Sequence, residues 1–134
     1  MKKILLIDDE DVNHFILDNL LRLGGFGSEL IYKRSVDDGL EYLKSCINTG
    51  EPLPDTIFVD LEMPIRKGWD FLDEYRHIFM ELQPDCKVFI FTSSIISNDI
   101  ERAKSYEEVE GYLSKPISIE LLKEIKSKYF VKEK

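Results

Sequence analysis

Short apolar runs of the sequence end in polar residues that could bind a cation and a phosphate group: Asp8 with Asp9, then Asp60, Thr92 and Lys115. If these runs are parallel strands of one sheet, their carboxyl ends meet at one edge, where such sheets bind ligands. Three carboxylates within a few ångströms of one another repel by roughly 4 kcal/mol per pair at an effective dielectric constant near 20, so a cation must lie among them. Mg²⁺ prefers such oxygen ligands together with a substrate phosphate oxygen, and Lys115 supplies a second positive charge.

Each of these residues also has an ordinary structural explanation. An aspartate at the end of a strand often caps the following helix, a lone threonine often bonds to the backbone of a loop, and a lone lysine is usually a solvated charge. Their joint occurrence after several strands of one sheet is hard to explain by chance. The five residues are therefore best explained as one site.

Hydrophobic periodicity predicts five strands that alternate with five helices. Apolar runs predict strands at residues 4–7, 30–32, 56–59 and 88–91, and a short strand that ends at Leu113. Helical spacing and capping residues predict helices at 11–23, from Ser35, after Gly68, at about 98–106 and from Ser118. Right-handed crossovers between such strands produce a doubly wound α/β fold, a five-stranded parallel sheet with helices on both faces.

Apolar positions at helical spacing predict the helix faces that pack on the sheet. They are Val12, Phe15, Ile16, Leu20 and Leu23; Val36, Leu40, Leu43 and Ile47; Leu72, Tyr75, Phe79 and Leu82; and Leu122, Ile125 and Tyr129. Trp69 and three phenylalanines of the strands, Phe58, Phe89 and Phe91, are expected in the core.

Length and composition fit one soluble domain, because 134 residues with 43% hydrophobic content can form one core. The formal net charge of −8 would repel a polyphosphate backbone, which argues against direct nucleic-acid binding. Cys46 and Cys86 lack the spacing of zinc ligands and are expected to be reduced, half-buried packing residues. The apolar run after Lys2 and Lys3 has only four residues, so we expect a cytoplasmic protein without membrane insertion.

Four sequence motifs contain the candidate residues. They are Asp8-Asp9-Glu10-x-x-Asn13; Asp60-Leu61-Glu62-Met63-Pro64-x-x-x-Gly68; Phe91-Thr92-Ser93; and Tyr112-Leu113-Ser114-Lys115-Pro116. In order and spacing they resemble the motifs of the receiver domain of two-component response regulators, which has a flavodoxin-like fold. The resemblance extends from the first predicted strand to the last predicted helix.

The resemblance implies a role for each acidic residue of the site. Asp60 would accept the phosphoryl group, Asp9 would bind Mg²⁺ directly, and Asp8 would act largely through a water molecule. The backbone carbonyl of Glu62 would be a further ligand of the metal, together with Asp60. Glu62 and Ser94 occupy two positions that line the site and differ among family members, so the lifetime of the phosphorylated state stays open.

The resemblance also implies which residues respond to phosphorylation. Lys115 would pair with one phosphoryl oxygen and the Thr92 hydroxyl with another. Ser93 stands where the family often has alanine and still leaves room for the phosphoryl group. The ring of Tyr112 would turn inward as Thr92 moves toward that group. The peptide bond between Lys115 and Pro116 would be cis, as is usual in the family.

For the whole chain, the resemblance implies a phosphorylation-dependent signalling switch that is not an enzyme with a substrate of its own. A histidine kinase or a histidine phosphotransfer protein would donate the phosphoryl group. The surface around the fourth helix, the Tyr112 strand and the last helix would then bind a downstream protein, or the phosphoryl group would be relayed. Because the last helix starts near Ser118, residues 1–134 are expected to be one stand-alone receiver domain without an output domain, similar to chemotaxis regulators, and a monomer or phosphorylation-dependent dimer.

Three other functions fit the sequence less well. A haloacid-dehalogenase-like Mg²⁺-dependent phosphatase needs the motif DxDx[TV] after its first strand, and the corresponding residues 9–13 end in Asn13. A flavodoxin-like flavin site needs free amides and hydroxyls in its first loop, where four consecutive acidic residues would repel phosphate. A receiver-like module that binds partners without phosphorylation is the main alternative, although Asp60, the acid pair, Thr92 and Lys115 are all present.

Overall fold

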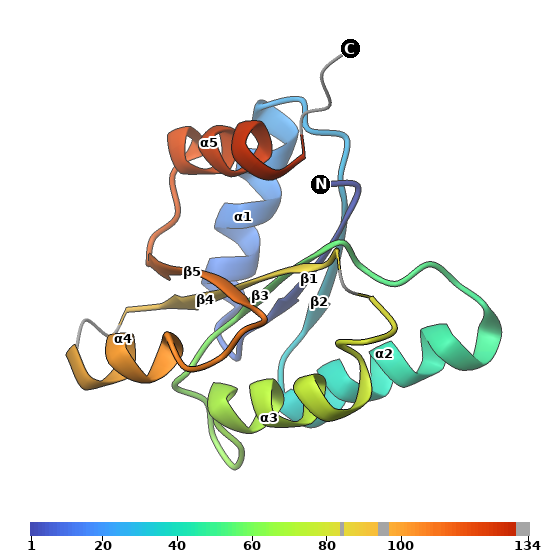
Figure 1. Cartoon of the computed structure of the whole chain (residues 1–134). Coiled ribbons are helices and arrows are strands. Elements are labelled where there is room, and N and C mark those ends of the chain that lie inside the picture. The colour runs from blue at the N-terminus through green and yellow to red at the C-terminus, as the bar shows by residue number, and fades with distance from the viewer. Residues whose placement is uncertain (84, 94–96, 131–134) are drawn as a thin grey trace.

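The computed structural model describes residues 1–83, 85–93 and 97–130 of the chain (Figure 1). Strands and helices alternate in the order β1 (Lys3–Ile7), α1 (Asp11–Leu23), β2 (Glu29–Lys33), α2 (Val36–Thr49), β3 (Thr56–Val59), α3 (Gly68–Ile78), β4 (Lys87–Thr92), α4 (Ser97–Ala103), β5 (Val109–Ser114) and α5 (Ile119–Tyr129). The predicted alternation is confirmed. Helix α4 is shorter than predicted because the amides of Ser105 and Tyr106 bond three residues back, in a tighter turn. None of the described helices has the length and apolar character needed to cross a membrane.

All five strands are parallel and lie in the order β2-β1-β3-β4-β5. Figure 1 shows α1 and α5 on one face of the sheet and α2 and α3 on the other. The predicted doubly wound α/β fold is therefore confirmed. The chain passes from β1 to β2 on one side and later enters β3 on the other side, so the strand order reverses between β1 and β3. Open α/β sheets bind ligands in the crevice at this point.

The sheet has a hydrophobic core on each face because alternate residues of a strand point to opposite sides. In β1, Leu5 and Ile7 pack in the cluster that contains the apolar residues of α2 and α3. Ile4 and Leu6 pack in the other cluster, with residues of α1 and α5. Every residue of β1 and β3 is buried, which explains why each strand is apolar after its first residue. These two buried strands therefore fix the positions of the residues that follow them.

The buried face of α1 differs from the prediction. The helix buries three residues: Asn13, Leu17 and Leu21. Three apolar residues that the spacing predicts to be buried are instead 58%, 67% and 79% exposed: Val12, Phe15 and Leu23. The apolar pattern misplaces the face because a polar side chain, Asn13, takes the buried position in the first turn.

Some other side chains also differ from the predicted core. Ile47 is 42% exposed, and Cys46 takes the buried position beside it. Leu82 is 60% exposed because α3 ends at Ile78 and the helical spacing does not continue. Trp69 is half-buried at the edge of the core. Both cysteines are free thiols, and both are buried, whereas half-buried positions were expected.

The predicted helix starts at two serines are confirmed. The hydroxyl oxygen of Ser35 accepts a hydrogen bond from the amide of Asp38 at 3.1 Å, and that of Ser118 accepts one from the amide of Leu121 at 3.1 Å. Gly50 follows α2 with a φ of 78°, a left-handed conformation that glycine adopts without steric cost. Local sequence therefore determines where these helices begin and end.

Ile65 is strained in the loop between β3 and α3. Its φ is 70°, which β-branched residues rarely adopt, and its side chain is 98% exposed. Asparagine tolerates this conformation, so Ile65→Asn is expected to raise the free energy of unfolding by about 1 kcal/mol. Ile65→Val keeps the branched side chain and serves as the control. Equal midpoints of urea unfolding for the two variants would contradict the inference that the backbone of Ile65 is strained.

Candidate functional site

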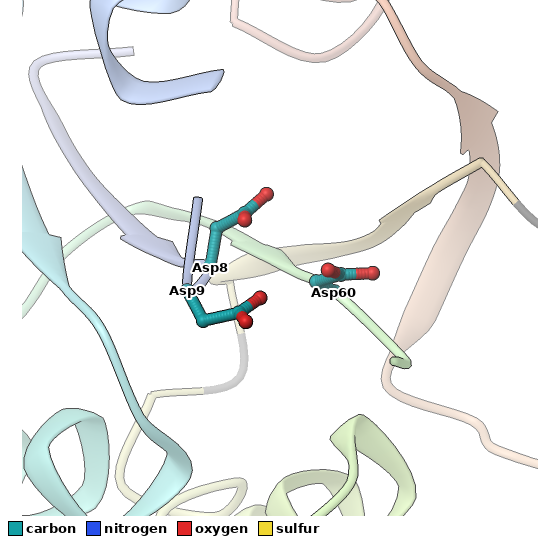
Figure 2. A group of neighbouring side chains, drawn as sticks. All are labelled: Asp8, Asp9 and Asp60. Carbon is teal, nitrogen blue, oxygen red and sulfur yellow. The ribbon is translucent and has the colours of Figure 1, made fainter. Parts of the chain in front are cut away.

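Three aspartates meet at the point where the strand order reverses (Figure 2). Asp8 and Asp9 follow β1, and Asp60 follows β3, the strand that pairs with β1. One carboxylate oxygen from each residue lies within 4.8 Å of the other two. Asp8 is fully buried and Asp60 is 3% exposed, whereas Asp9 is half-buried. The structure thus brings together the three acids that the sequence places at the strand ends.

Backbone contacts fix the position of the Asp60 carboxylate. The Asp60 amide donates to the carbonyl of Ile7 at 3.0 Å, which extends the pairing of β1 and β3. Oδ1 of Asp60 accepts a hydrogen bond from the amide of Glu62 at 3.2 Å. Gly68 packs against this backbone so closely that a Cβ there would lie 2.3 Å from the Asp60 carbonyl oxygen. Only glycine allows this approach, which explains its place in the motif.

Asp8 is held by a local network that includes a residue to which the motif gave no role. Its Oδ1 accepts from the amide of Glu10 at 2.9 Å, and its Oδ2 accepts from Nδ2 of Asn13 at 3.1 Å. Asn13 Nδ2 also donates to Oε1 of Glu10 at 3.0 Å. Asn13 therefore positions Asp8, a role that sequence reasoning missed. Its signal was its place as the last residue of the first motif.

Lys115 is the cation shared by the two buried carboxylates. Its Nζ lies 2.8 Å from Oδ2 of Asp8 and donates to Oδ2 of Asp60 at 3.0 Å. The backbone amide of Lys115 donates to the carbonyl of Thr92 at 3.0 Å, which aligns the ends of β4 and β5. The peptide bond between Lys115 and Pro116 is cis, as the resemblance implies.

Burial and charge act in opposite directions on Asp60 and Lys115. Burial raises the pKa of the Asp60 carboxyl above its usual value; the bond from Lys115 opposes this effect and the charge of Asp8 adds to it. Burial lowers the pKa of Lys115, but its bonds to Asp8 and Asp60 outweigh burial, and the pKa is raised overall. One ammonium group therefore compensates the two buried carboxylates only in part.

The remaining predicted residues lie on β4, on β5 and beyond. Thr92 is buried at the end of β4, and Ser93 is exposed beside it. Tyr112 of β5 is half-buried opposite Ile90, in the same hydrophobic cluster. Thr92 lies two residues after Ile90 and so faces the same side of the sheet as Tyr112. Ser94 lies outside the described residues.

The donor set suits a hard divalent cation. The three aspartates offer only oxygen atoms, which Mg²⁺ prefers while it keeps positions for water and phosphate oxygens. The side chain of Glu62 is exposed and 3.5 Å from Nζ of Lys67, so its backbone is the part that reaches the acids. The arrangement can hold a cation and present an Asp60 oxygen to an incoming electrophile.

Comparison with known proteins agrees with this description. The family model of the response regulator receiver domain matches residues 4–126. The probable methanogenesis regulatory protein FilR2 of Methanothrix harundinacea is 29% identical over 120 residues, which are 90% of this chain and 76% of FilR2. The sensor histidine kinase CheAY of Helicobacter pylori is 32% identical over 89% of this chain and 14% of its own length. The transcriptional regulatory protein HptR of Staphylococcus aureus is 30% identical over 87% of this chain and 42% of its own length.

Solved structures share the fold. A two-component response regulator from Cytophaga hutchinsonii has a TM-score of 0.87 and 26% identity, and the match covers 96% of each chain. The Mn²⁺-bound form of response regulator Rcp1 has a TM-score of 0.79 and 22% identity, over 99% of this chain and 98% of Rcp1. The family match extends over most of the chain and includes β3, all of β1 except Lys3, and the three aspartates after these strands. The protein therefore belongs to the response regulator receiver domain family.

Proposed function

We propose that the protein is a phosphorylation-dependent signalling switch, in which Asp60 accepts a phosphoryl group from a phosphohistidine of a histidine kinase or phosphotransfer protein. The observation that carries this proposal is the buried Asp60 carboxylate, grouped with Asp8 and Asp9 and bonded to Lys115. Domains of this family are regulatory and generally not enzymes. The only reactions proposed for the chain are therefore its own phosphoryl uptake and loss.

Each residue around Asp60 would have a separate role in phosphoryl transfer. The Glu62 amide fixes Oδ1 of Asp60, and Lys115 bonds to Oδ2. One carboxylate oxygen attacks phosphorus in line with the leaving imidazole nitrogen, so an O–P bond forms as the N–P bond breaks. A Mg²⁺ ion held by Asp8, Asp9, Asp60 and the Glu62 carbonyl would neutralise charge on the transferred oxygens. Lys115 can then turn its N–H groups from the carboxylates to a phosphoryl oxygen.

Phosphorylation would reach a partner-binding surface through Thr92 and Tyr112. A phosphoryl oxygen on Asp60 is an acceptor that can draw in the Thr92 hydroxyl, and the exposed Ser93 leaves space beside it. Tyr112, on the same face of the sheet, would turn inward and change the surface of α4, β5 and α5. A shift from 1:99 to 99:1 takes about 5.5 kcal/mol, which a few charge-assisted hydrogen bonds can supply.

Intact-mass measurement tests the acceptor. After incubation with acetyl phosphate or phosphoramidate, the wild type is expected to gain about 80 Da when Mg²⁺ is present, which is the mass of one phosphoryl group. No gain is expected in EDTA, because the repulsion among the acids is then uncompensated. Asp60→Asn should gain nothing in either condition. Asp85→Asn, which changes an exposed aspartate, should gain as much as the wild type.

Two other outcomes would count against the proposal in different ways. An adduct that persists in Asp60→Asn would assign the acceptor to another residue. If the wild type forms no adduct, beryllofluoride, a phosphoryl mimic, should still shift the amide resonances of Thr92 and Tyr112 if the site is competent and its phosphate short-lived. If beryllofluoride also has no effect, the chain is an interaction module that works without phosphorylation.

A further inference from the structure

A second candidate site lies near the amino-terminal ends of β4 and β5, at the end of the sheet opposite to Asp60. A cavity of about 770 Å³ opens between the end of α3 and the segments that lead into β4 and β5. We refer to it as the α3–β5 cavity, and its lining includes Tyr75, Arg76, Met80, Glu81, Glu107 and Glu108. Its volume falls in the range of small-molecule sites, roughly 300–1,000 Å³. The phosphorylation site uses none of these residues.

Two buried oxygen atoms of this lining, Oε1 of Gln83 and Oε2 of Glu108, have no hydrogen-bond partner among the described residues, and the hydroxyl of Tyr75 has only a weak partner, the Cys86 thiol. Tyr75 is 1% exposed and Glu108 is 6% exposed. Oε1 of Glu108 accepts from Nε and Nη2 of Arg76, both at 3.3 Å, so only one carboxylate oxygen is satisfied. A buried acceptor without a donor costs about 1–3 kcal/mol, and more when it is charged. Oε2 of Glu108 and Oε1 of Gln83 can only accept hydrogen bonds, so the lining favours a ligand that brings N–H groups.

The charge of the lining favours a cationic ligand. Four glutamates and one arginine line the cavity, which gives it a formal charge of −3. Arg76 cannot neutralise them all, because it bonds to Glu108 and its guanidinium also lies 4.8 Å from the ring centroid of Tyr106. A metal ion fits less well than an organic cation. Among the described residues, only Asp8, Asp9 and Asp60 bring three such ligand atoms close together.

We propose that the α3–β5 cavity binds an organic cation, an alkyl ammonium or an alkyl guanidinium. Its N–H groups bond to Oε2 of Glu108 and to the oxygen of Tyr75, and its hydrocarbon chain lies along Met80. Burial raises the pKa of the Tyr75 hydroxyl, so Tyr75 stays neutral and Glu108 provides the charge. The side chain of Arg76 is 38% exposed, and its rotation would expose Oε2 at the cost of its bonds to Oε1 of Glu108 and to the carbonyl of Ser105. The N–H groups of the ligand would replace the bonds lost at Glu108.

NMR titration of the whole chain tests this site with two probes, agmatine and the blocked tripeptide Gly-Arg-Gly. Saturable shifts are expected for the amides of residues 75–83 and 107–110. Glu108→Gln should weaken binding at least tenfold, which is about 1.4 kcal/mol. Glu101→Gln makes the same charge change at an exposed position on α4 and should leave binding unchanged. Tighter binding of agmatine would identify a small free cation as the ligand, and tighter binding of the peptide an arginine of another protein.

Tyr75→Phe provides a second variant in case Glu108→Gln does not fold. The change removes a hydroxyl whose partner is the Cys86 thiol, a weak acceptor, so the midpoint of unfolding without ligand should differ little from that of the wild type. Its affinity for the better probe should nevertheless fall. The proposal is overturned if neither probe gives saturable shifts, or if the folded variants bind as tightly as the wild type.

Discussion

Replacing Lys115 by methionine is expected to lower the free energy of unfolding by about 3–5 kcal/mol in the absence of Mg²⁺. Methionine keeps an unbranched side chain but removes the ammonium that lies 2.8 Å from Asp8 and 3.0 Å from Asp60. Both carboxylates then stay buried without the cation that they share. An uncompensated buried charge is expensive because the protein replaces its hydration poorly. Urea unfolding at neutral pH in EDTA measures the loss.

Two comparisons separate this electrostatic effect from packing. Lys104→Met removes one partner of an exposed ion pair, with side chains 69% and 72% exposed, and should change stability by less than about 1 kcal/mol. Mg²⁺ should restore part of the stability of Lys115→Met, because a divalent cation bound to the folded state supplies the missing charge. If Lys115→Met loses no more than Lys104→Met, or if Mg²⁺ has no effect on it, then Lys115 does not neutralise the acids.

The convergence of Asp8, Asp60 and Lys115 can be predicted from sequence because it depends on topology alone. Asp8 and Asp60 follow apolar runs and Lys115 follows the last short strand, and right-handed crossovers bring the ends of such parallel strands to one end of the sheet. The one Nζ that bonds to both carboxylates could not be predicted, because side-chain geometry decides it. Periodicity thus places residues in the same region but does not pair their atoms.

The buried face of α1 shows where pattern reasoning fails. Counting apolar residues selects Phe15 and Leu23, yet the packed face includes Asn13, whose side chain bonds to Asp8. The hydrogen bond from Asn13 to Asp8 thus decides which side chain is buried in the first turn of α1. Ile65 is a similar case, because no local pattern requires a β-branched residue with a φ of 70°. The structure thus departs from local rules at Asn13, which bonds to Asp8, and at Ile65, in the loop that follows Asp60.

The unpaired atoms of the α3–β5 cavity have no sequence signal either. Tyr75 belongs to the predicted core stripe, and its ring is indeed buried. Whether its hydroxyl finds a partner depends on segments that lie far away in sequence, such as the one that contains Glu108. Burial can be predicted from periodicity, whereas hydrogen-bond satisfaction requires the tertiary structure.

Asp60→Asn is expected to make the protein more stable at neutral pH, by on the order of 1 kcal/mol. The fold raises the pKa of Asp60, chiefly by burial, so folding disfavours the ionised carboxylate. The contribution of Asp60 to the stability of the wild type is therefore fully present below the ordinary pKa of 3.8 and is lost as the pH rises through the folded-state pKa. Asparagine does not ionise, so the advantage of the variant should grow between about pH 4 and neutrality. Urea unfolding across this range measures the difference.

Asp85→Asn is the matched control, because the same change at an exposed aspartate should give no such pH-dependent gain. Mg²⁺ should narrow the difference, since the wild type offers three clustered carboxylates and Asp60→Asn offers two. If Asp60→Asn is less stable than the wild type at neutral pH, the bond from Lys115 outweighs burial. The stability of the wild type relative to the variant would then rise with pH. An aspartate whose removal stabilises the fold is retained for a reason other than stability, and mass measurement on the same variant identifies that reason.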